Sequence, residues 1–220
     1  MRAWPGLRAG AWLLGRLLRA HPTAVAVLAL ALGWTLIQSL SEIGITSELR
    51  RPRGFFYELA FLALAVAGSL GVWILGRHEW LWGAASRGQR AAAEAGFLLA
   101  GGALALGLAW SPAVVSGADL PWGAGGAALL HVGALAWLVT RAPTSHGVRP
   151  LLFVSLIWGI PPLFAGEPEP LASLGRWLGG PLEFTSAAGT QTRMPGPVDT
   201  TPAVACALAA WLLTPRTPRS

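Results

Sequence analysis

Residues 55–76 read FFYELAFLALAVAGSLGVWILG, an apolar run in which Glu58 is the only charged residue. An α-helix rises about 1.5 Å per residue, so a run of this length can cross a hydrocarbon core about 30 Å thick. The whole chain is similar in character: of its 220 residues 54% are hydrophobic and 12% are charged, and the mean hydropathy is +0.54. Too few polar side chains remain to cover a soluble globule, so we expect an all-α, polytopic membrane protein.

Further apolar runs predict about six transmembrane helices within a single transmembrane domain. Besides the run already quoted, we expect spans at residues 23–40, 91–110, 120–140, 150–166 and 202–214. The last run has only about 13 residues, which suits a re-entrant or short tilted segment as well as a full span. Residues 1–22 combine arginines and leucines at helical spacing, which predicts an interfacial amphipathic helix. Leucines at helical spacing predict a second interfacial helix in the long outer loop, residues 167–200.

The arginines predict how the chain is oriented. All sixteen basic residues are arginine, and short cytoplasmic segments of membrane proteins are enriched in basic residues. If both termini are inside, eleven arginines lie in inner segments and five lie in outer ones. We therefore expect a multi-pass protein of the bacterial inner membrane with cytoplasmic termini. An arginine-only set of basic residues can reflect a GC-rich genome, so no nucleic-acid partner is inferred from the pI near 11.4.

The sequence lacks the residue patterns that usually carry enzyme or metal chemistry. It has one cysteine, Cys206, four scattered histidines, and no HExxH or Walker A motif. Residues 68–71 read GSLG, but Ala67 stands where a nucleophile elbow requires glycine. The only two aspartates, Asp119 and Asp199, lie in expected outer loops. We expect neither a catalytic residue, nor a metal site, nor a cofactor, and any ATP would be bound by a partner.

Two polar residues inside apolar runs are candidates for an intramembrane site. Glu58 lies near the outer end of the second span and His131 lies within the fourth. Ionisable groups at membrane depth are costly and often functional. Two structural alternatives remain: Glu58 can reach the headgroups or pair with Arg51 or Arg53, and His131 can be a hydrogen-bonded packing residue.

The loop between the second and third spans is short and basic. It reads RHEWLWGAASRGQR over residues 77–90. Its alanine, leucine and tryptophan content suits a helix lying along the membrane, with Arg77, Glu79, Arg87 and Arg90 available to a soluble partner. The alternative is a solvated loop whose arginines only set the topology.

The order of these features also suggests a family. A basic amphipathic N-terminus is followed by an outer loop, the second span, Arg77 and Glu79, a small-residue stretch with Ala84, Ala85 and Gly88, and a glycine-rich third span. This order resembles the membrane part of the LptF/LptG permeases of lipopolysaccharide-export ABC transporters. That family carries a periplasmic β-jellyroll between its third and fourth spans, whereas here the connection runs only from about residue 111 to 119.

The resemblance implies a permease subunit that moves a lipid or another amphiphile and is energised by a separate ATPase. It implies that residues 77–90 are a coupling segment that docks on the ATPase, and that the subunit pairs with a second permease as a homo- or heterodimer. An ABC-2 or heme-exporter-like permease shares the length, the six spans and the N-terminal interfacial helix. A non-transporting membrane scaffold or assembly factor is an alternative of another class, and a membrane enzyme of unrecognised type ranks last.

Overall fold

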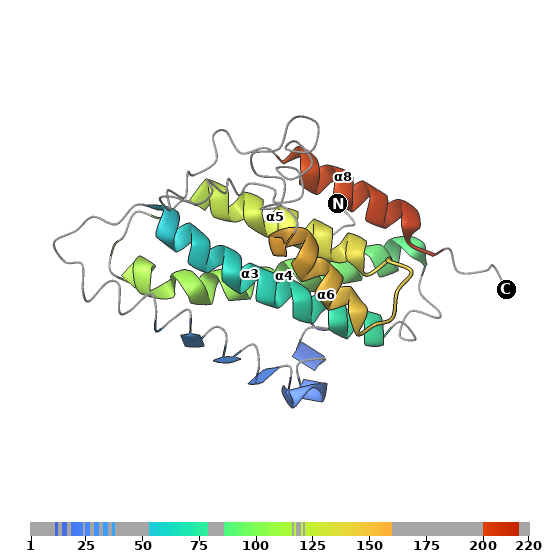
Figure 1. The fold of residues 1–220 in the computed structure, drawn as a ribbon, viewed down its shortest axis with the longest axis horizontal. Helices are drawn as coiled ribbons and strands as arrows, with labels where there is room; N and C mark the ends of the chain where they lie inside the picture. Colours follow the sequence, from blue (N-terminus) through green and yellow to red (C-terminus); the bar gives the residue numbers. More distant parts are fainter. Residues whose placement is uncertain are drawn as a thin grey trace.

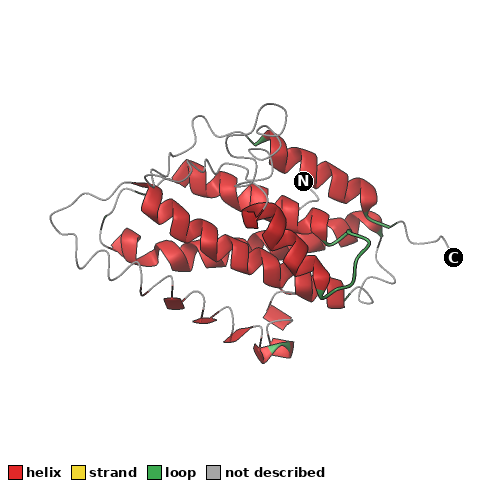
Figure 2. Cartoon of the chain, viewed as in Figure 1, coloured by secondary structure: helices red, strands yellow, loops and turns green. Residues whose placement is uncertain are grey.

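The computed structural model of the chain describes residues 53–78, 86–115, 117, 120, 122–159 and 200–215, together with isolated positions between 12 and 37. Every regular element in these ranges is helical, as Figure 2 shows, and this confirms the expected all-α class. The elements are α3 (Arg53–Arg77), α4 (Arg87–Val115), α5 (Trp122–Val139), α6 (Val148–Val154), the π-helical turn η2 (Ser155–Gly159) that continues α6, and α8 (Thr201–Leu213).

Three of the described helices are long and apolar enough to cross a membrane, which supports a membrane protein. They cover Leu59–Arg77, Arg87–Val115 and Trp122–Val139. Two shorter apolar helices cover Val148–Ile157 and Thr201–Leu213. At about 1.5 Å per residue the latter is about 20 Å long, shorter than the hydrocarbon core. The expected helix at residues 1–22, the span at 23–40 and the outer loop at 167–200 lie outside the continuously described residues.

The helices form a bundle in which α5 contacts most of the others. It packs against α3, α4, α6 and α8, while α3 also packs against α4 and α6 (Figure 1). Consecutive helices run in opposite directions, so the C-terminal ends of α3, α5 and α8 lie beside the N-terminal ends of α4 and α6. We call this side of the bundle the arginine end, after the arginines at the described ends of α3–α6: Arg77, Arg87, Arg90, Arg141 and Arg149.

Small residues allow the helices to approach one another closely. A Cβ atom added at Gly125 in α5 would lie 2.1 Å from Cη2 of Trp110, which is 1% exposed on α4. A Cβ at Gly102 in α4 would lie 2.5 Å from Cδ1 of Leu129 in α5. Lipid tails are as apolar as leucine, so membrane helices gain from close packing across small residues. Gly102 and Gly125 thus let α4 and α5 pack closely against each other.

Candidate functional site

A buried carboxylate lies at the centre of the arginine end. Glu94 projects from α4 and its side chain is 2% exposed. Its Oε1 atom pairs with Nε of Arg90, one helical turn earlier, at 2.9 Å. Its Oε2 atom accepts a hydrogen bond from the indole N–H of Trp137 at 3.0 Å and pairs with Nη2 of Arg141. A buried charge is tolerated only when it is paired and hydrogen-bonded, and these three partners satisfy that condition.

The charges around Glu94 do not cancel. Arg87 and Arg90 occupy the first turn of α4, where the positive end of the helix dipole disfavours cations. Arg141 adds a third guanidinium, and its side chain is 5% exposed. Two arginines therefore share the carboxylate of Glu94 and Arg87 lies one turn before Arg90, so these described side chains carry an excess of positive charge.

A second contact at this end joins the start of α4 to the end of α8. Nε of Arg87 donates a hydrogen bond to the carbonyl oxygen of Trp211 at 3.1 Å, and Nη2 donates to the same oxygen. The guanidinium carbon also lies 4.4 Å from the centroid of the Trp211 ring. The same oxygen also accepts the backbone N–H of Thr214 at 3.2 Å, so Arg87 reinforces the C-terminal end of α8 and adds a cation–π contact.

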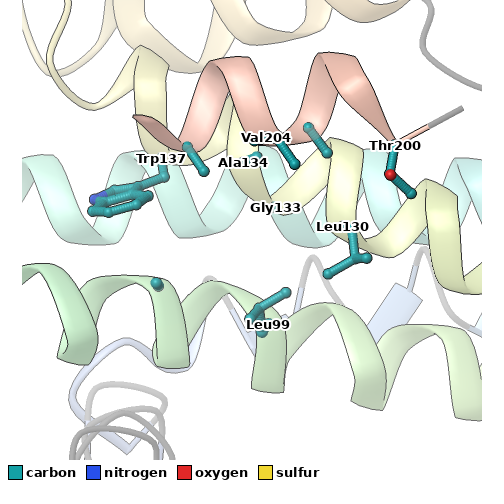
Figure 3. Close-up of a pocket in the computed structure, with 10 residues that line it drawn as sticks. Leu99, Leu130, Gly133, Ala134, Trp137, Thr200 and Val204 are labelled. Carbon is teal, nitrogen blue, oxygen red and sulfur yellow. The ribbon is translucent and has the colours of Figure 1, made fainter. Parts of the chain in front are cut away.

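An apolar groove runs between α4 and α8 and has α5 as its floor (Figure 3). Its volume is about 310 Å³, within the range typical of ligand sites. The hydroxyl of Thr200 and the indole N–H of Trp137 are the polar groups on its lining side chains, and the N–H is bonded to Glu94. The lining residues are Ala95, Leu99, Leu130, Gly133, Ala134, Trp137, Thr200, Ala203, Val204 and Ala207.

Trp137 connects the groove to the charged cluster. Its ring lines the groove, and its N–H points to the carboxylate of Glu94. The groove itself is apolar, and the ion-paired cluster of Glu94, Arg90 and Arg141 lies just beyond Trp137 at one end of it. Such a site suits a molecule that has a hydrocarbon part and a polar head.

Three of the four predicted coupling residues lie at the arginine end, but they do not form one cluster. Arg77 is exposed at the end of α3, and its guanidinium lies 5.6 Å from the Trp73 ring. Arg87 and Arg90 share the first turn of α4 and contact Trp211 and Glu94, respectively. Glu79 lies outside the described residues.

The two predicted intramembrane residues both lie in helices. His131 is 2% exposed on α5 and does not line the groove. Glu58 belongs to α3, but its side chain lies outside what the structure describes.

Sequence reasoning missed Glu94, Trp137, Arg141 and the groove. The Arg90–Glu94 pair could have been predicted from the sequence, because Glu94 follows Arg90 by four residues and i,i+4 pairs of opposite charge face each other on a helix. The partnership with Arg141 had no such signal, because 47 residues separate the two side chains. Only the packing of α4 on α5 brings them together.

A pair of histidines forms another polar contact at the arginine end. Nε2 of His21 lies 2.6 Å from Nε2 of His78, and the His21 ring packs edge-on against Trp73 at 5.4 Å between centroids. Burial, followed by the nearby charges of His21 and Arg77, lowers the pKa of His78 from its usual 6.5. A short contact between two imidazole nitrogens requires at least one neutral ring, and the lowered pKa favours that form.

The described residues contain no group of three or more histidine, cysteine, aspartate or glutamate side chains that could hold a metal ion. Comparison of the chain with protein-family models, with curated proteins and with solved structures gave no match. The groove and the arginine end are therefore the features from which function is inferred.

Proposed function

We propose that this chain is the permease subunit of an ABC-type transporter that moves a lipid or another amphiphile across the bacterial inner membrane. The observation that carries the proposal is the groove of about 310 Å³ between α4 and α8. A methylene group occupies roughly the volume of a water molecule, about 30 Å³, so the groove holds about ten methylenes of one hydrocarbon chain. Its apolar lining and its charged end match the two parts of an amphiphile.

The contacts of α8 provide a route for the groove to open. This helix packs on α5, and at the arginine end the Arg87–Trp211 contact ties it to α4. Breaking that polar contact would let α4 and α8 separate while the packing of α8 on α5 is kept. Transport requires a site with two arrangements that an energy source can bias.

The segment from residue 77 to residue 90 is where a partner ATPase would act on this site. It joins α3 to α4 and ends at the turn that contains Arg87 and Arg90. A partner that engages Arg77, Glu79, Arg87 and Arg90 would move the start of α4 and strain the Arg87–Trp211 contact. In this scheme the partner binds the ATP, the arginine end faces the cytoplasm, and a second permease completes a homo- or heterodimer. An LptF/LptG-like or an ABC-2/heme-exporter-like permease would fit it.

A non-transporting scaffold or assembly factor is the second candidate, and one observation favours it. Arg87 and Arg90, which a coupling segment would present to a partner, contact Trp211 and Glu94 of the same chain. The Arg87 contact joins α4 to α8, and Glu94 also binds Trp137 and Arg141 at the end of α5, so the three helices are held together as a static platform requires. On this reading the loop would bind a partner without moving α4.

The decisive experiment is to purify the tagged full chain from its native host in mild detergent and to identify bound proteins and lipids by mass spectrometry, with and without nucleotide. A permease should retain an ATP-binding cassette subunit in stoichiometric amount and show lipid-stimulated hydrolysis. Replacing Arg77 and Glu79 by alanine should abolish that stimulation, whereas Arg176→Ala, in the loop expected on the opposite face, should not. An intact, monodisperse protein without an ATPase would favour the scaffold.

A further inference from the structure

We infer that the groove binds one acyl chain of an anionic phospholipid, with the phosphate held by Arg87 at the arginine end. This inference rests on the proposed function only in taking the groove as the amphiphile site. It adds the charge of the headgroup, the residue that recognises it and the direction in which the lipid lies.

The direction of the lipid follows from the residues that continue the walls of the groove. On α4 the lining residues Leu99 and Ala95 are spaced by four, and two further steps of four lead to Arg87. On α8 the lining residues Thr200, Val204 and Ala207 continue to Trp211 in the same way. Residues four apart lie on one helix face, so both walls lead to the Arg87–Trp211 contact. Arg87 lies about 12 Å along the helix from Ala95, at 1.5 Å per residue.

The opposite end of the groove, where the first backbone N–H groups of α8 lie, has no cationic side chain among its lining residues. Thr200 supplies a single neutral hydroxyl there, and the other lining side chains from α8 are Ala203, Val204 and Ala207. An acyl chain that enters with its methyl end toward Thr200 leaves its headgroup at the arginine end. The reverse orientation would place a phosphate among apolar side chains, where an unpaired charge is costly.

The sign of the headgroup follows from the local charges. Arg90 and Arg141 share the carboxylate of Glu94, Arg87 binds the Trp211 carbonyl without an acidic partner among the described contacts, and the positive end of the α4 dipole adds to these charges. A guanidinium carries about five N–H donors, and Arg87 directs Nε and one Nη2 N–H to the Trp211 carbonyl. The remaining donors suit a phosphate oxygen. A zwitterionic headgroup would bring its own cation into this positive region.

The first experiment tests the acyl-chain part of the site. The full chain in detergent is titrated with phosphatidylglycerol and with phosphatidylcholine of the same acyl composition, and bound lipid is counted by native mass spectrometry. Ala207→Phe fills the groove and should remove the bound lipid. Ala205→Phe, on the exposed face of the same helix, is the matched control and should leave it in place. Equal binding by the two variants would show that the groove is not the lipid site, and would overturn the proposed function with this inference.

The second experiment tests the headgroup part alone. Wild-type protein should bind phosphatidylglycerol about tenfold more tightly than phosphatidylcholine, the gain expected for one charge-assisted contact. Arg87→Gln should abolish that preference, whereas Arg77→Gln, which removes the same charge from the exposed end of α3, should keep it. If Ala207→Phe blocks binding but Arg87→Gln leaves the preference intact, the inference fails while the amphiphile site stands. Thermal unfolding of each variant checks that α8 remains docked.

Discussion

Removing the carboxylate of Glu94 should destabilise the bundle more than any other single change at the arginine end. The Glu94 side chain is 2% exposed, and it pairs with Arg141, whose side chain is 5% exposed. Removing one partner of a buried ion pair leaves an uncompensated buried charge, at about 3–5 kcal/mol. The hydrogen bond from Trp137 is lost as well, which adds about 1 kcal/mol. We therefore expect Glu94→Ala to lower the free energy of unfolding by about 4–6 kcal/mol.

The assay is reversible unfolding of the purified full chain in mixed detergent micelles, followed by tryptophan fluorescence. The double variant Glu94→Ala/Arg141→Met is the informative control, because it removes the stranded charge together with its partner. It should recover at least half of the lost stability, since well-packed apolar residues often replace buried ion pairs at little cost. Arg90→Gln should cost less than Glu94→Ala, because the Arg141 pair and the Trp137 bond both remain.

Two results would refute this reasoning. A loss below about 0.5 kcal/mol for Glu94→Ala would place the pair in the range of exposed ion pairs and show that Glu94 is not buried in the native bundle. A double variant as unstable as Glu94→Ala would show that the loss does not come from an unpaired Arg141.

Gly125→Ala should lower the midpoint of thermal unfolding, because its Cβ would lie 2.1 Å from the Trp110 ring, and overpacking a core typically costs about 1–3 kcal/mol. Gly126→Ala is the matched control: a Cβ there meets nothing within 4 Å, so alanine should leave the midpoint unchanged or raise it. The His21–His78 contact should weaken under acid. Because the pKa of His78 is lowered on folding, the contribution of this contact to the free energy of unfolding is complete above pH 6.5 and declines as the pH falls below that value. Protease accessibility of the N-terminal segment between pH 8 and 5 would measure this, and a profile unchanged in His78→Gln would contradict it.

The site was less predictable from the sequence than the helices. The run at residues 55–76 lies within α3, because about twenty consecutive apolar residues are the length of a helix that spans the hydrocarbon core. The coupling segment was expected to reach residue 90, whereas α4 already begins at Arg87. The alanines that follow Arg90 favour helix, and the helix extends back to the residue after Ser86, whose hydroxyl accepts from the backbone N–H of Gln89 at 3.3 Å.

The apolar runs by themselves determined that this protein is helical and membrane-embedded, because hydropathy acts locally along the chain and needs no knowledge of neighbouring helices. Tertiary structure alone decided which polar groups meet. Glu94 and Arg141 lie 47 residues apart, and Arg87 and Trp211 lie 124 apart, so no local pattern could pair them. The groove depends likewise on how α4 and α8 rest on α5. A site formed between helices is a property of their packing, whereas each helix is a property of its own sequence.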